Sequence, residues 1–169
     1  MSSPLIRPAS VEDAPRIAVL GAQVWVQTYV DTGISEVVAR YILETFAVKR
    51  VRALVEDSSA AVLVAEEEGR LAGYVVLRLG SWHGDISSEI ETLYVHEPLT
   101  EEGIGSALLA RSRDVAMDRT GSRAVWVAVN SRNERALGFY RARGLAADGI
   151  TYFELGGAKY ENTVMVGRS

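Results

Sequence analysis

The chain has 169 residues, of which 48% are hydrophobic and 24% charged, and its net charge at pH 7 is −4. This length predicts one domain, residues 1–169, large enough to bury a substantial core. The chain has no cysteine and only two histidines, which excludes disulfides, thiolate zinc sites and cysteine nucleophiles, so we expect no metal. The mild acidity disfavours nucleic acid as a partner and suits a small cationic substrate.

The ends and the apolar segments give no sign of a membrane or an export signal. No apolar run approaches the roughly 18–20 residues that a membrane helix needs. The N-terminal sequence MSSPLIRPAS lacks the basic start and the apolar stretch of a signal peptide. We therefore expect a cytoplasmic protein with no membrane partner.

Hydrophobic periodicity predicts mainly helices in the first third of the chain. After a short strand at Leu5–Pro8, apolar residues at helical spacing predict a helix that begins at Ser10 or Asp13. Two more helices are expected over Ser35–Phe46 and Val48–Glu56.

The pattern then changes to strands and to alternating elements. A hairpin turning at Gly69 and a further strand are predicted over Ala61–Ala65, Leu71–Leu79 and Ser88–Val95. The remaining chain predicts a helix, a strand, a helix and two last strands, over Gly103–Asp118, Ala124–Val129, Ser131–Arg143, Thr151–Leu155 and Thr163–Val166. This order predicts an α/β (α+β mixed) fold, with a mixed sheet flanked by helices.

The segment ETLYVHEPLTEEGIGSALLA predicts a strand, a polar loop and a helix that opens with Gly103 and Gly105. Unpaired N–H groups at a helix start can hold a diphosphate, and glycine lets the backbone approach it closely. A G-x-G pair alone is also common in ordinary strand–turn–helix connections. Leu108 stands where a dinucleotide-binding fingerprint has its third glycine, and the Gly-Lys-Ser/Thr of a P-loop is missing.

The segment VAVNSRNERALGFYRARGL predicts a second marked helix. Ser131 and Glu134 have the spacing of a capping box, and Ala136, Phe139 and Tyr140 recur on one face. Taken alone, this is a structural helix whose tyrosine packs in the core.

Together, the two segments resemble the two cofactor motifs of the GNAT acetyltransferase superfamily. Asn133, Ala136, Tyr140 and Gly144 match the second motif, Asn-x-x-Ala-x-x-x-Tyr-x-x-x-Gly. The resemblance implies a central mixed, mostly antiparallel sheet of six to seven strands flanked by about four helices. It also implies an acetyl-CoA-dependent N-acetyltransferase that acetylates a primary amine of a small molecule by direct attack in a ternary complex. The segments SEIETLYV and W-x-x-T-Y further resemble bacterial PaiA-like polyamine acetyltransferases.

The family resemblance also implies which residues meet acetyl-CoA. In the family, strand residues meet the pantetheine arm through their backbone, and the following loop wraps the pyrophosphate. The motif asparagine lies near the cofactor, and the motif tyrosine can protonate the leaving thiolate. These positions are Leu93, Tyr94, Val95, Thr100, Glu101, Glu102, Gly103, Ile104, Gly105, Ser106, Asn133 and Tyr140. Thr100 departs from the Gln or Arg of the family, and Glu101 and Glu102 place negative charge beside an anion site.

Catalysis needs a base for the amine and an acid for the leaving thiolate. Tyr140 is the expected acid. Glu89 and Glu91 are the expected bases because they alternate with Ile90 and share one strand face, although a solvated face is the other interpretation. His96 is a lesser base candidate. Trp25, Tyr29 and Trp82 are candidates to line an amine site through cation–π contact.

Other functions and the assembly stay open. A non-catalytic acyl-CoA-binding or sensing domain is favoured by Thr100, Glu101 and Glu102. A protein N-terminal or lysine acetyltransferase is another alternative, although Ala128 stands where ribosomal-protein alanine acetyltransferases carry a glutamate. A homodimer is one of the assemblies left open.

Overall fold

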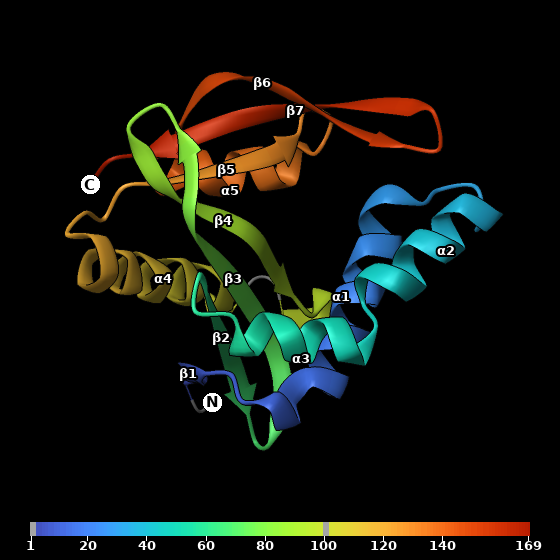
Figure 1. Ribbon diagram of the computed structural model, residues 1–169, viewed down its shortest axis with the longest axis horizontal. Helices are drawn as coiled ribbons and strands as arrows, with labels where there is room; N and C mark the ends of the chain where they lie inside the picture. The colour runs from blue at the N-terminus through green and yellow to red at the C-terminus, as the bar shows by residue number, and fades with distance from the viewer. Residues whose placement is uncertain (1–2, 100–101) are drawn as a thin grey trace.

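Figure 1 shows the computed structural model, which describes residues 3–99 and 102–169. Seven strands form one sheet in the order β1-β2-β3-β4-β5-β7-β6. They are β1 (Leu5–Pro8), β2 (Ala60–Glu67), β3 (Arg70–His83), β4 (Ile86–Val95), β5 (Val125–Asn130), β6 (Ala146–Leu155) and β7 (Ala158–Gly167). All neighbouring pairs are antiparallel except β4–β5, which confirms the predicted mostly antiparallel sheet.

Five α-helices flank the sheet in the described part of the chain. They are α1 (Ala14–Tyr29), α2 (Glu36–Thr45), α3 (Val48–Glu56), α4 (Ile104–Thr120) and α5 (Glu134–Ala142). Short 3-10 turns lie at Val11–Asp13 and Glu97–Leu99. Within residues 3–99 and 102–169, no helix is long and apolar enough to cross a membrane.

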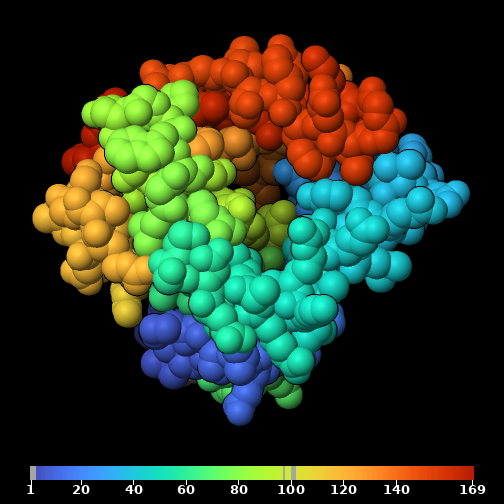
Figure 2. Space-filling view, in the orientation of Figure 1, coloured from blue at the N-terminus to red at the C-terminus, as the bar shows by residue number. Residues whose placement is uncertain are grey.

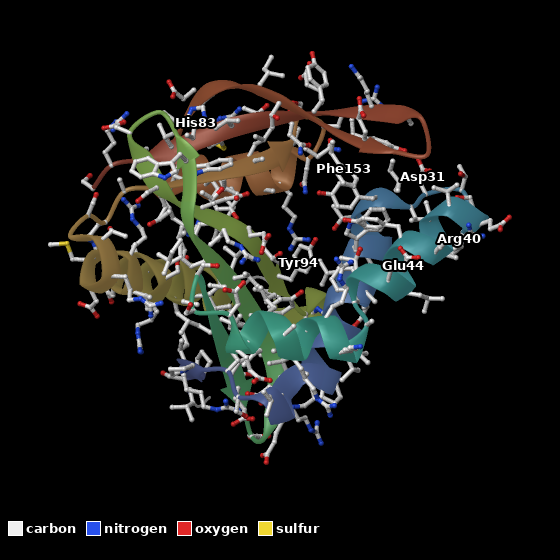
Figure 3. The ribbon with its side chains drawn as sticks, in the orientation of Figure 1. Asp31, Arg40, Glu44, His83, Tyr94 and Phe153 are labelled. Atoms are coloured by element: carbon white, nitrogen blue, oxygen red, sulfur yellow. The ribbon has the colours of Figure 1, made fainter. Side chains whose placement is uncertain are left out.

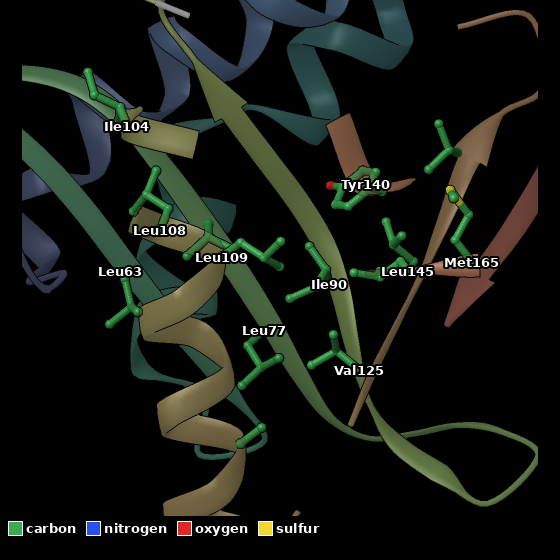
Figure 4. Close-up of a cluster of buried hydrophobic side chains, with 14 of the residues drawn as sticks. Leu63, Leu77, Ile90, Ile104, Leu108, Leu109, Val125, Tyr140, Leu145 and Met165 are labelled. Atoms are coloured by element: carbon green, nitrogen blue, oxygen red, sulfur yellow. The ribbon is translucent and has the colours of Figure 1, made fainter. Parts of the chain in front are cut away.

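The alternation of side chains along β2 and β3 divides the core into two layers. On one face, residues such as Leu63, Val75 and Leu77 pack with α4 and α5 (Figure 4). On the other face, Val62, Val64 and Val76 pack with α1 and α3. Each fully buried aliphatic side chain contributes roughly 1.5–3 kcal/mol, so the two layers fix the sheet between the helices.

The predicted capping box at Ser131 is wrong. Helix α5 begins one residue after Asn133, whose side-chain oxygen accepts a hydrogen bond from the backbone N–H of Ala136 at 3.1 Å. The Ser131 hydroxyl instead contacts the hydroxyl of Thr163 on β7 at 2.8 Å. Asparagine caps as well as serine does, so local spacing alone does not distinguish the two starts.

Strands β4 and β5 separate soon after they meet. Within the described residues, they pair in parallel only at Glu89 and Trp126. The rest of β4, Ile90–Val95, pairs with β3 on one side and leaves its other edge without a strand. This gap divides the sheet and gives both faces access to the backbone of β4.

A buried carboxylate fastens the first helix to the sheet. Asp13 is 2% exposed, and its oxygens accept two hydrogen bonds from Arg7 on β1, at 2.8 and 2.9 Å, and one from Arg16 on α1, at 2.6 Å. The backbone N–H of Ser10 donates a fourth at 2.8 Å. These donors, led by Arg7, hold the pKa of Asp13 far below its usual value.

We expect Asp13→Asn to lower the free energy of unfolding by about 2–4 kcal/mol at pH 7, because two arginines lose their shared carboxylate. The contribution of Asp13 is complete above the ordinary aspartate pKa of about 3.9 and is lost as pH falls toward the lowered folded-state pKa. In urea titrations, the gap between parent and variant should therefore shrink between pH 5 and pH 2. The control is Glu36→Gln, which breaks the exposed pair with Arg40 and should cost less than about 0.5 kcal/mol. A gap that is constant with pH would contradict the assignment.

Candidate active site

A cleft of about 550 Å³ lies on the face of the sheet that carries α1 and α3. Figure 2 shows it as a hollow near the centre of the molecule, bordered by β6 and β7 above and by α2 and α3 below and to the right. Its lining residues come from elements far apart in sequence, from α1 at one end of the chain to β7 at the other. Among them are Trp25, Tyr29, Tyr41, Tyr74, Glu89, Glu91, Tyr94, Asn130, Phe153 and Tyr160.

Aromatic side chains form a continuous wall along one side of the cleft. Trp25 lies 4.9 Å from Tyr29 and 5.1 Å from Tyr41, measured between ring centroids. Tyr41 on α2 in turn meets Phe153 on β6 edge-on, at 5.7 Å. Figure 3 shows Phe153 below the β6–β7 pair and Tyr94 lower in the same space. Electron-rich ring faces of this kind can hold an organic cation.

The turn between β6 and β7 packs against α2. A side chain at Gly156 would place its Cβ 2.8 Å from Val37, and the backbone there has φ +59°. Only glycine fits both the contact and the left-handed conformation without strain. The β6–β7 turn and α2 therefore meet beside the cleft, which stays open on the side seen in Figure 2.

Three tyrosines, on β3, β4 and α5, have raised pKa values. Tyr74 and Tyr94 on neighbouring strands meet edge-on at 5.9 Å. Tyr140 on α5 is 6% exposed and belongs to the core layer on the opposite face (Figure 4). Burial raises the pKa of all three, and the charge of Tyr140 adds to the shift in the pKa of Tyr94. Tyr140 is not among the residues that line the cleft.

The two carboxylates of β4 both line the cleft, as their alternation predicts, but their surroundings differ. Glu89 is half-buried, and its Oε1 accepts a hydrogen bond from the Ser81 hydroxyl at 2.8 Å. Burial raises the pKa of Glu89, and the charge of Glu91 raises it further. Glu91 is 40% exposed and is bound by Arg78 at 3.2 Å, which also binds Asp57 at 2.9 Å. Among the described residues, Glu89 therefore forms no ion pair, although the charge of Arg78 partly offsets the rise in its pKa, whereas Glu91 is paired with Arg78.

The start of α4 lies against α5 on the other side of the gap. Gly103 caps the helix at φ +80°, and Gly105 lies so close to Phe139 that an added Cβ would be 3.1 Å from the ring. Ser106 accepts a hydrogen bond from Arg143 at 2.6 Å. The first-turn amides of α4 and the open edge of β4 therefore lie in one neighbourhood.

Not every predicted residue lies at this site. Thr100 and Glu101 lie outside the described residues, and Glu102 is exposed. Leu93 and Val95 pack against the core layer under α4, so only their backbone can serve the gap. His96 lines a separate groove between α1 and the β2–β3 turn. Trp82, which is 66% exposed near the end of β3, does not line the described cleft, so its expected place there is wrong.

Half of the aromatic wall has no clear signal in the sequence. Periodicity indicates Tyr41 only as part of an apolar helix face, and Phe153 only as part of a strand. Their joint position depends on the turn at Gly156, which brings β6 over α2. Helical spacing of Tyr41 with Ile42 is the one local signal, and it indicates burial, not a binding site.

Comparison with known proteins assigns this architecture to a class. The model of the acetyltransferase (GNAT) family matches residues 29–145. An uncharacterized N-acetyltransferase of Mycobacterium tuberculosis is 29% identical over 154 residues, which cover 91% of this chain and 96% of that protein. An uncharacterized N-acetyltransferase of Lactobacillus delbrueckii subsp. lactis is 22% identical, with 87% of each chain covered.

Solved structures share the fold. The PaiA N-acetyltransferase of Thermoplasma acidophilum, in complex with coenzyme A, has a TM-score of 0.82 at 20% identity and covers 99% of this chain and 100% of its own. The acetyltransferase yncA of Salmonella typhimurium, with acetyl-CoA, has a TM-score of 0.67 at 22% identity, covering 99% and 94%. The chain belongs to the acetyltransferase (GNAT) family. This confirms the predicted class, an acetyl-CoA-dependent N-acetyltransferase.

Because α4 and α5 are in close contact at Gly105 but not at Gly138, we expect substitutions at these two glycines to have opposite effects on stability. Gly105→Val should lower the free energy of unfolding by about 1–3 kcal/mol, because its side chain must displace the Phe139 ring. Gly138→Ala, on the exposed face of α5 with no atom within 4 Å of the added Cβ, should raise it by roughly 0.5–1 kcal/mol. Thermal or urea unfolding of both variants measures this. Equal effects at the two positions would show that the α4–α5 contact is loose in solution.

Proposed function

We propose that the chain transfers the acetyl group of acetyl-CoA to a primary amine of a small molecule, by direct attack in a ternary complex. The observation that carries the proposal is the gap between β4 and β5, which joins the open edge of β4 to a cleft lined by aromatic rings and carboxylates. Two structural neighbours hold coenzyme A or acetyl-CoA, which supports this donor.

The residues present fit the donor. Backbone groups of Leu93–Val95 at the open edge of β4 offer strand-like hydrogen bonds to the amides of a pantetheine arm. The first-turn N–H groups of α4, from Ile104 to Ser106, suit a diphosphate. The Asn133 side-chain oxygen accepts the capping hydrogen bond from Ala136, so its amide N–H₂ group can donate a hydrogen bond to acetyl-CoA. Acetyl-CoA, when bound, supplies the thioester carbonyl.

Glu89 is the proposed base. An amine reaches the cleft as an ammonium, with a pKa near ~10, and must lose a proton before its nitrogen attacks. Glu89 has no ion pair among the described residues, and burial raises its pKa toward the range useful for a base. Glu91, already bound by Arg78, contributes negative potential that attracts the ammonium. Glu89 takes one proton from the ammonium, and the free amine nitrogen then attacks the thioester carbonyl. The C–N bond forms as the C–S bond breaks, and the second proton of the nitrogen goes to the departing thiolate, which leaves as the thiol.

Tyr140 is proposed to assist the leaving sulfur. Burial raises its pKa further above the roughly 8.5 of a thiol, so complete proton transfer to the thiolate is unfavourable. We therefore assign Tyr140 first as a hydrogen-bond donor to the sulfur as negative charge develops there. No hydrogen bond joins its hydroxyl to another residue of the described chain, so the donor is available.

An acceptor screen tests the function. Free-thiol release from acetyl-CoA should be measured with polyamines, aminoglycosides, amino acids and peptide N-termini. We expect turnover with small cationic amines in preference to peptides, because aromatic rings line the cleft. Acetyl-CoA binding without turnover on any amine would favour the acyl-CoA sensor, and preference for peptides would favour a protein acetyltransferase.

Glu89→Gln should lower kcat by about 100-fold or more, because the amide cannot take a proton. In the parent, kcat/KM should rise with pH as Glu89 loses its proton, with a midpoint above the usual glutamate pKa of about 4.3. The variant should lack this acid limb.

The neighbours of Glu89 supply matched controls for the same pH profile. Glu91→Gln removes a charge that raises the pKa of Glu89, so the acid limb should move to lower pH. Ser81→Ala removes a hydrogen bond that lowers this pKa, so the limb should move to higher pH. If the acidic limb of the kcat/KM–pH profile moves in neither variant, a residue other than Glu89 titrates there.

Tyr140→Phe should lower kcat by roughly 10-fold or more while the Kd for acetyl-CoA changes less than about twofold, because the hydroxyl acts on the departing sulfur. Single-turnover kinetics on a good acceptor, together with calorimetric titration of the donor, measure the two quantities. Unchanged kcat would remove Tyr140 from the mechanism.

A further inference from the structure

Arg143, at the end of α5, is fixed against the first turn of α4. Its Nε donates to the Ser106 hydroxyl at 2.6 Å, and its Nη1 donates to the Phe139 carbonyl at 2.8 Å. The guanidinium also lies over the Phe139 ring, 3.8 Å from the centroid. A half-buried arginine held by three contacts has lost most of its rotamer freedom in the folded protein.

The charge of this guanidinium is not neutralised by a neighbouring acid in the described part of the chain. No carboxylate pairs with Arg143 among residues 3–99 and 102–169. The connection from β4 to α4, HEPLTEEGIGS, contains no lysine or arginine and three glutamates. The sequence of this connection therefore supplies no cation for a diphosphate at the start of α4, and a compensating cation has to come from another element.

We propose that Arg143 is the phosphate-binding cation of the acyl-donor site, directed at the diphosphate of acetyl-CoA. The inference rests on the proposed donor. Two of the five N–H donors of the guanidinium are used within the protein, which leaves both Nη2 donors and one Nη1 donor. Because Ser106 accepts from Nε, its own hydroxyl proton is free to be donated to a phosphate oxygen. Arginine suits this task because its planar fork can bind two phosphate oxygens at once.

The packing around Phe139 explains how the cation is held in position. The Phe139 ring lies between Gly105 on one side and the Arg143 guanidinium on another. Because Gly105 has no side chain, the Phe139 ring can lie close to α4. The Arg143 guanidinium stacks on this ring and is thereby placed within hydrogen-bonding distance of Ser106. A cation placed before the ligand arrives costs little additional entropy on binding.

Calorimetric titration of the full chain tests the proposal, with acetyl-CoA, 3′-dephospho-acetyl-CoA and S-acetylpantetheine as probes. Arg143→Met should raise the Kd for the first two by about 10-fold or more and leave the third unchanged, because only the third lacks the diphosphate. The dependence of Kd on salt should also weaken. The matched control is Arg141→Met, which removes the same charge from an exposed position on α5 and should change each Kd by less than about threefold.

Each other outcome has a defined meaning. Equal Kd values for the Arg143 and Arg141 variants would overturn the proposal while leaving acetyl-CoA as the donor. An effect confined to acetyl-CoA and absent with the dephospho form would assign Arg143 to the 3′-phosphate and overturn the diphosphate assignment. If the unmodified chain binds no acetyl-CoA, both the donor and Arg143 proposals fail. If Arg143→Met does not fold, Arg143→Lys decides: an increased Kd for both nucleotides supports the proposal, and an unchanged Kd overturns it.

Discussion

The separation of β4 from β5 after a single parallel pair is the constraint on which the rest of the site depends. A strand edge inside a protein has backbone N–H and C=O groups that need partners. In the described residues, no strand pairs with this edge of β4 at Ile90–Val95. Its backbone N–H and C=O groups can therefore form hydrogen bonds with an extended ligand that contains amides.

A sheet divided in this way needs support on both sides. The buried Asp13 fastens α1 to β1, and α1 then carries Trp25 and Tyr29 to the cleft. At the other end of the sheet, the β6–β7 turn packs against α2 through the contact between Gly156 and Val37. The edge-on contact between Tyr41 on α2 and Phe153 on β6 joins helix and strand directly, so the elements that support the sheet also line the cleft.

Local sequence patterns predict the elements well and the site only in part. The helix and strand order follows from periodicity, and Gly103 and Gly105 mark the start of α4 through their spacing alone. The β6 strand is longer than expected, Ala146–Leu155, because its first half is stabilised by pairing with β7 and not by its own apolar pattern. Likewise, the meeting of Tyr41 with Phe153 depends on tertiary packing, which no local window contains.

The proposed acceptor site and the proposed acetyl-CoA site each contain a charged side chain without an ion-pair partner in the described residues. At the proposed acceptor end, Arg78 is paired with Glu91 and forms no ion pair with Glu89 in the described residues, and the net effect of burial and charge is a raised pKa for Glu89. At the donor end, Arg143 has no carboxylate partner among the described residues and lies beside a helix start that favours anions. An unpaired charge in a partly buried place is unfavourable, so Glu89 favours binding of a cation and Arg143 favours binding of an anion. An ammonium at Glu89 and a diphosphate at Arg143 would satisfy both, and binding of the two substrates would then also stabilise the folded chain.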